Sequence, residues 1–147
     1  MDLEDNIAHY LLSPSLVLST GAQIIDLLQE GLINTGAGSS GAYPYAYGLR
    51  YDVDLPSFTV SNVEVNPRVE GTWEAIDEAA TYTVVTNSFL ARGGDGYFTA
   101  EDLDKVDTFK EYAQAFVDFV EEVGSVEDVP LDVYSTKSIT GGRTCSA

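Results

Sequence analysis

A glycine-rich turn that follows a run of β-branched residues constrains this chain most strongly. Residues 81–86 read Thr-Tyr-Thr-Val-Val-Thr, which is typical of a β-strand. Residues 87–97 follow directly and read Asn-Ser-Phe-Leu-Ala-Arg-Gly-Gly-Asp-Gly-Tyr, so that glycines surround a single acid, Asp95. Glycine adopts positive φ and lets a ligand come close to the backbone. A strand that ends in such a turn, with an aromatic residue beside it, therefore predicts a binding loop.

A calcium loop is the first alternative for this turn. Residues 95–102, Asp-Gly-Tyr-Phe-Thr-Ala-Glu-Asp, look like the second half of an EF-hand, in which glycine occupies the sixth position. If Gly96 is that glycine, Ala91 and Gly93 occupy positions 1 and 3, and neither has a side-chain oxygen. Position 12 is then Asp102, which is shorter than the glutamate that normally binds through both oxygens. The calcium hypothesis is therefore the weakest of those considered.

The length and composition of the chain predict one globular domain. A chain of 147 residues can bury a sizeable core, and its 44% hydrophobic content argues against disorder. No apolar run approaches the length of a transmembrane helix, and the acidic start of the chain does not resemble a signal peptide. We expect a domain over residues 1–135 and a flexible, polar tail over residues 136–147.

The charge of the chain argues against two classes of partner. The 24 acidic residues against 7 basic ones give a net charge of −17, and the basic residues are scattered. Nucleic acids and anionic membranes require clustered Lys and Arg, so neither is expected as a partner. The single cysteine, Cys145, cannot form an internal disulfide, and with the single histidine, His9, it forms no zinc motif. No catalytic residue and no metal ligand is predicted.

The hydrophobic pattern predicts a mixed fold of strands and helices. Thr20 is expected to cap a helix that ends at Gly31, and residues 33–42 to form a flexible loop. A second helix is expected from Asp107, as its cap, to Gly124, as its stop, with an aromatic stripe packed in the core. These elements do not alternate strictly, so an α/β or α+β domain is predicted. The expected strands cover residues 16–19, 49–54, 58–60, 63–65, 73–76, 81–86 and 131–134.

Four segments in the same order resemble the C-terminal domain of the 5′-nucleotidase family. The turn itself matches the family signature Phe-Leu-Ala-x-Gly-Gly-Asp-Gly-Tyr. The segment Thr-Gly-Ala-Gln at residues 20–23 with the helix after it, the strand Gly-Leu-Arg-Tyr-Asp at residues 48–52, and the late helix at residues 107–124 are also similar. The resemblance spans about residues 16–135. It implies a mixed sheet with flanking helices and a role in nucleotide catabolism.

The resemblance also implies a nucleoside pocket. In the family two aromatic rings enclose the base, and the matching positions are Phe89 and Tyr43, although Tyr45 is close enough to compete with Tyr43. Asp95 corresponds to the carboxylate that binds the ribose. Gly93 and Gly94, with Gly96, would bring the backbone close to the sugar. Ordinary core packing for the rings and a turn-stabilising role for Asp95 are the alternatives.

The family hydrolyses phosphate esters with two divalent metals on an N-terminal metallophosphoesterase domain, which this chain does not match. We therefore expect a nucleoside- or nucleotide-binding domain that is not catalytic by itself, holds no cofactor, and meets that N-terminal domain or another protein. Family members are exported, which implies an extracellular or periplasmic location. The alternative is a free-standing, non-catalytic binding or structural subunit. It is favoured by Met1 and by the divergent Leu-Ser-Pro-Ser at residues 12–15, where the family has Pro-Phe-Gly-Asn.

Overall fold

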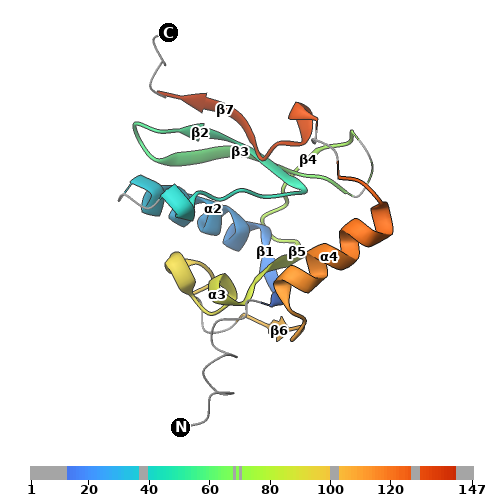
Figure 1. Cartoon of the computed structure of the whole chain (residues 1–147). Helices are drawn as coiled ribbons and strands as arrows, with labels where there is room; N and C mark the ends of the chain where they lie inside the picture. Colours follow the sequence, from blue (N-terminus) through green and yellow to red (C-terminus); the bar gives the residue numbers. More distant parts are fainter. Residues whose placement is uncertain are drawn as a thin grey trace. The chain divides into compact units, whose positions relative to one another are not determined.

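The computed structural model describes residues 13–36, 40–67, 69, 71–99, 103–126 and 130–141. The chain divides into two compact units, which are described separately. The first consists of Met1–Ser19 and Thr81–Asp128, and the second of Thr20–Ala80 and Val129–Ala147. Each unit contains a small β-sheet and at least one helix (Figure 1). The predicted mixed α/β class is confirmed.

A three-stranded sheet forms the centre of the first unit, in the order β5-β1-β6. Strand β1 (Pro14–Thr20) lies between β5 (Thr81–Asn87) and β6 (Lys105–Asp107), and it pairs antiparallel with β6. The alternation of β1 buries Ser15, Val17 and Ser19. The strands predicted at residues 16–19 and 81–86 are therefore confirmed. Strand β5 leads directly into the short helix α3 (Ser88–Ala91) and the 3₁₀ turn η2 (Gly94–Gly96).

The late helix of the first unit is shorter and more exposed than the sequence predicts. Helix α4 covers Tyr112–Val123, with Glu111 at its N-cap, whereas Asp107 lies at the end of β6. Gly124 ends the helix with φ of 78°, as predicted. The helix buries no residue, and its aromatic side chains Tyr112, Phe116 and Phe119 are all more than half exposed. The prediction that this stripe belongs to the core is wrong, because periodicity identifies an apolar face but not what covers it.

A four-stranded sheet forms the centre of the second unit, in the order β4-β3-β2-β7. Strand β2 (Leu49–Asp54) pairs antiparallel with β3 (Thr59–Val65) and parallel with β7 (Thr136–Thr140), and the two-residue β4 (Glu74–Ala75) extends the β3 edge. Helix α2 (Gly21–Gly36) lies along this sheet and contacts β3 (Figure 1). The core between helix and sheet contains Ile24, Leu28, Leu32, Tyr51, Val53, Val60 and Val63.

Helix α2 begins where the sequence predicts but continues further. The Thr20 hydroxyl accepts a hydrogen bond from the Gln23 amide (3.2 Å), and the Gln23 side chain accepts one from the Thr20 amide (2.7 Å), which is a reciprocal capping box. Gly31 does not end the helix, because the fully buried Leu32 keeps the following turn packed in the core. Gly36 ends it instead. The loop predicted at residues 33–42 is thus helical up to Gly36 and forms the 3₁₀ turn η1 at Ser40–Ala42.

The end of the described chain also differs from the prediction. Residues 131–134 do not form a strand; a 3₁₀ turn, η3, covers Leu131–Val133. The last strand is β7, which starts at Thr136 and therefore occupies the first part of the segment predicted to be a tail. Most of β7 is polar and exposed, as expected of an edge strand, so no apolar pattern announces it. Residues 142–147 of the predicted tail lie outside the described residues.

In the described part of the chain no helix is long and apolar enough to cross a membrane.

Candidate functional site

The predicted binding loop is built from α3, a left-handed turn and η2. Asn87, the first residue of the signature, caps α3, because its side-chain oxygen accepts a hydrogen bond from the Leu90 amide at 2.9 Å. Gly93 then adopts φ of 97°, and its amide donates to the Leu90 carbonyl at 2.9 Å. Gly96 also has positive φ, at 78°. Two of the three glycines therefore serve the backbone geometry that the sequence predicted.

Gly94 serves a different purpose from its neighbours. A Cβ atom at this position would lie 2.5 Å from the Cε1 and Cζ atoms of Phe89, so that only glycine leaves room for the ring. The close approach that the sequence predicts at Gly94 is thus made by the aromatic ring of the same loop. Phe89 remains 49% exposed. An aromatic ring supported by a glycine backbone and still half accessible has the properties of a stacking platform.

Asp95 is exposed at the tip of the loop. Its φ of 52° is a left-handed conformation that aspartate tolerates better than most residues. The adjacent Tyr97 and Phe98 are buried and anchor the loop in the first unit, and the Lys105 ammonium donates to the Phe98 carbonyl at 2.7 Å. Burial raises the pKa of the Tyr97 phenol to about 12, and the negative charge of Asp95 contributes to the same shift. The loop therefore presents an exposed carboxylate on a firmly anchored base.

Tyr43, the second predicted ring, belongs to the second unit. Its hydroxyl forms a hydrogen bond with Thr136 Oγ1 at 2.6 Å, and its ring is half-buried. Tyr45, which competed for the same assignment, is 83% exposed, and the centroids of these two rings are 4.8 Å apart. Tyr51 fixes the segment between them, because its hydroxyl donates to the Pro44 carbonyl at 2.5 Å. The pairing of Tyr43 with Phe89 across a base stays a prediction.

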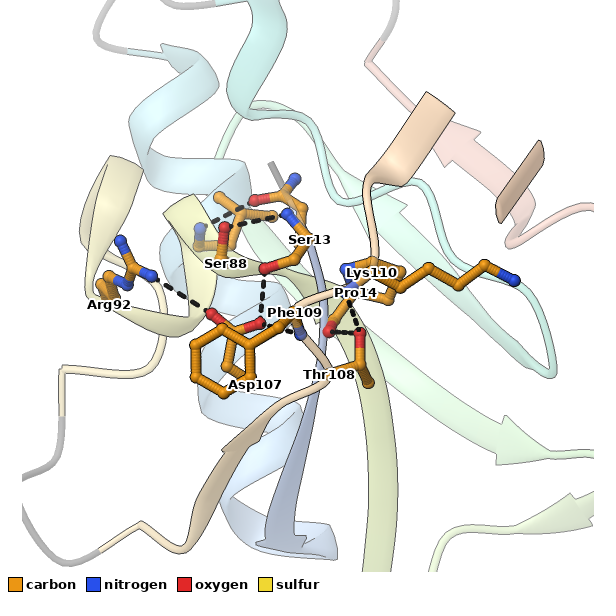
Figure 2. A network of polar contacts seen from close by, with 10 residues as sticks. Ser13, Pro14, Ser88, Arg92, Asp107, Thr108, Phe109 and Lys110 are labelled. Carbon is orange, nitrogen blue, oxygen red and sulfur yellow. Dashed lines mark hydrogen bonds and ion pairs between the residues drawn. The ribbon is translucent and has the colours of Figure 1, made fainter. Parts of the chain in front are cut away.

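Behind the loop lies a polar cluster that the sequence did not reveal as part of the site (Figure 2). It joins four residues: Ser13 directly before β1, Ser88 at the start of α3, Arg92 at the C-cap of α3, and Asp107 at the end of β6. Three hydrogen-bond donors surround the Asp107 carboxylate, and the Ser13 hydroxyl is the main reason that the pKa of Asp107 lies below its usual range. The sequence gives no signal for this cluster, because Ser13 is separated from Ser88 by 75 residues and from Asp107 by 94.

The described residues contain no group of three or more His, Cys, Asp or Glu side chains that could hold a metal ion. The end of the hypothetical calcium loop, residues 100–102, lies outside the described residues. What the loop does offer is an aromatic surface for stacking and a carboxylate that can accept two hydrogen bonds from neighbouring hydroxyl groups.

Comparison with known proteins assigns the same segment to one family. Residues 15–103 match the model of the family described as "5′-nucleotidase, C-terminal domain". The chain is 35% identical over 107 residues to the NAD 5′-nucleotidase of Haemophilus influenzae, covering 66% of this chain and 17% of that protein. The 5′-nucleotidase precursor of Thermus thermophilus has a similar solved structure, with a TM-score of 0.76 and 28% identity over 90% of this chain and 26% of that one.

A solved structure of the Haemophilus influenzae NAD nucleotidase is similar to the same degree. Its TM-score is also 0.76, with 25% identity over 93% of this chain and 26% of that chain. This chain thus spans less than a fifth of the length of the curated relatives that it matches.

Proposed function

Because the chain belongs to the family of 5′-nucleotidase C-terminal domains, we propose that it binds the nucleoside part of a nucleotide for a phosphate-ester hydrolase of that family. The observation that carries the proposal is the arrangement of the loop at residues 87–97. There a half-exposed Phe89 ring rests on Gly94, and an exposed carboxylate, Asp95, follows one residue later. The relatives named as nucleotidases support the same class of ligand.

Each part of the loop has a defined task in this proposal. The Phe89 ring stacks on the base, and such stacking contributes about 1–3 kcal/mol per base. Stacking distinguishes poorly between bases, which suits an enzyme that degrades several nucleotides. Asp95 accepts hydrogen bonds from the ribose hydroxyls. Gly93 gives the chain the left-handed turn that presents Asp95, and Tyr43 is the proposed second ring.

Hydrolysis itself is assigned to a different part of the protein. We propose that an N-terminal metallophosphoesterase domain would hold divalent metals, which would supply water activation and neutralisation of the phosphoryl oxygens, while this domain holds the nucleoside. In this proposal the metals are held outside the 147 residues, and the enzyme works in an extracellular or periplasmic compartment. The structures that the chain resembles extend well beyond it, since it covers 26% of each of the two described above.

One observation favours the second candidate, a non-catalytic binding or structural subunit. The apolar face of α4 is exposed, and a protein partner in an assembly could cover it. Such a subunit would retain the fold without binding nucleosides. The two candidates therefore make opposite predictions for the same titration.

The test is a calorimetric titration of the whole chain with adenosine and with AMP. We expect both ligands to bind, and the Phe89→Ala variant to bind about 5- to 150-fold more weakly, which corresponds to the loss of 1–3 kcal/mol of stacking. Phe119→Ala is the matched control, because Phe119 is a similarly exposed phenylalanine (51%) that belongs to α4 and not to the loop. No binding at millimolar ligand, or equal losses in the two variants, would contradict the proposal.

A further inference from the structure

The short helix that carries Phe89 depends on its surroundings for its orientation. Helix α3 contains four residues, Ser88–Ala91, and an isolated helix of this length is not stable in water. The direction of the Phe89 ring must therefore be fixed by contacts between α3 and the rest of the first unit.

The first residue of α3 is hydrogen-bonded to the residue that precedes β1. The Ser88 amide donates to the Ser13 carbonyl at 2.7 Å, and the Ser13 amide donates to the Ser88 hydroxyl oxygen at 3.1 Å. Both residues are buried, with 3% of Ser88 and 8% of Ser13 exposed. These buried hydrogen bonds stabilise the contact, because a buried polar group that loses its partner raises the free energy of the folded state.

Asp107 connects this contact to the other end of α3 (Figure 2). One carboxylate oxygen accepts hydrogen bonds from the Ser13 hydroxyl at 2.5 Å and from the Phe109 amide at 2.9 Å. The other accepts one from Arg92 Nη2 at 3.1 Å, and Arg92 is the C-cap residue of α3. A single carboxylate thus contacts both the residue that holds the start of α3 and the residue that ends it.

The end of β6 is itself fixed to β1, so the carboxylate has a rigid base. The Thr108 amide and hydroxyl both donate to the Pro14 carbonyl, at 3.1 and 2.7 Å. Of the two links from Asp107, the one to Ser13 carries more weight. The Asp107 side chain is 19% exposed and Ser13 is buried, whereas the Arg92 side chain is 66% exposed, and ion pairs in water contribute little.

We propose that Asp107 is a positioning residue for the nucleoside-binding loop, acting through Ser13 and Arg92 on the two ends of α3 and so on the Phe89 ring. The proposal rests on the proposed function, because it assigns Phe89 to ligand binding. In this proposal Asp107 acts through these two residues and not by contacting the ligand. If its loss lets the loop occupy the binding-competent arrangement only a tenth of the time, the apparent Kd rises about tenfold.

The variant Asp107→Asn removes the charge and one acceptor oxygen with little change of shape, and Ser13→Ala removes the buried link alone. Asp118→Asn is the matched control. Like Asp107, Asp118 accepts hydrogen bonds through both carboxylate oxygens, here from Lys110 and Gln114, but it lies on α4. For each variant, hydrogen exchange of the amides in residues 88–97 is measured without ligand, and the Kd for adenosine by calorimetry. Both are measured under conditions where urea unfolding shows every variant to be fully folded.

We expect faster exchange in residues 88–97 and about tenfold weaker binding in Asp107→Asn and Ser13→Ala, with no change in Asp118→Asn. If the wild type binds adenosine, unchanged exchange in this loop or an unchanged Kd in Asp107→Asn and Ser13→Ala would overturn the positioning role. The exchange measurement needs no ligand. If the wild type does not bind adenosine, the proposed function fails and this inference fails with it. Faster exchange in the variants would then show only that the hydrogen bonds of Asp107 stabilise the structure of the loop.

Discussion

Replacing Gly94 by alanine separates the support of the Phe89 ring from the stability of the fold. The added Cβ would lie 2.5 Å from two ring carbons and 2.6 Å from a third. Carbon atoms pack at about 3.5–4.0 Å, so the ring must move by about 1 Å or more. Gly94 does not have a positive φ, so the alanine backbone is not strained by itself.

The displaced ring can move into solvent without disturbing the core, because Phe89 is already half exposed. The free energy of unfolding should therefore change by no more than about 1 kcal/mol, part of it offset by the lower entropy of an unfolded chain that carries alanine in place of glycine. We expect a larger effect on the affinity for adenosine than on the stability of the fold. A loss of about 1 kcal/mol of stacking raises the Kd for adenosine roughly fivefold.

The assay combines urea unfolding with a calorimetric titration of adenosine, for Gly94→Ala and for Gly41→Ala. Gly41 is the control, because a Cβ there would meet nothing within 4 Å. Wild-type affinity in Gly94→Ala would refute the argument that the glycine holds the ring in its binding position. A loss of stability of several kcal/mol would show instead that Phe89 belongs to the core.

Two further predictions concern the second unit. Gly21→Ala should lower the free energy of unfolding, measured with urea, by about 1–3 kcal/mol. The new Cβ would lie 2.2 Å from the Asp77 carbonyl oxygen, and nearby backbone hydrogen bonds prevent this segment from moving away. A stability equal to that of Gly41→Ala would contradict this prediction. Hydrogen bonds from Asn62 to Asp52 and from Arg50 to Glu64 hold the pKa values of both carboxyls below their usual range. These hydrogen bonds therefore stabilise the fold fully above the unfolded-state pKa of about 4, and their contribution is lost as the pH falls through the lower folded-state pKa values. We expect the urea concentration at the midpoint of unfolding to decrease as the pH is lowered below about 5, and to decrease less steeply in Glu64→Gln. A midpoint with the same pH dependence in Glu64→Gln would show that the Arg50 contact contributes nothing.

Local signals made parts of the fold predictable from the sequence. Thr20 and Gln23 lie three residues apart, so the capping box depends only on a short stretch of the chain. The strand predicted at residues 49–54 is β2, and its alternating side chains bury Tyr51 and Val53. Gly124 ends α4 because a left-handed C-cap favours glycine, which is again a local requirement.

Features that depend on distant contacts could not be predicted in the same way. Gly31 looked like a helix end, but burial of Leu32 against the sheet outweighs the local preference of glycine. Strand β7 has no apolar pattern, and it exists because β2 offers it a parallel edge. The stripe on α4 was read correctly as an apolar face and wrongly as core.

The candidate site shows the same division between local and distant information. The positive φ of Gly93 and Gly96 follows from the motif itself, whereas the need for Gly94 arises from the position of the Phe89 ring. The hydrogen bonds of Asp107 to Ser13 and Arg92 join segments far apart in sequence, and a pattern search reads Asp107 only as a helix cap.

The central claim is that residues 87–97 bind a nucleoside, and nitrogen–proton correlation spectra recorded during a titration with adenosine test it most directly. We predict saturable shifts in the amide signals of Asn87–Tyr97, with Asp95 among the largest, and the same set of shifts with AMP. Spectra that stay unchanged at millimolar adenosine, or shifts confined to signals outside this loop, would contradict the account.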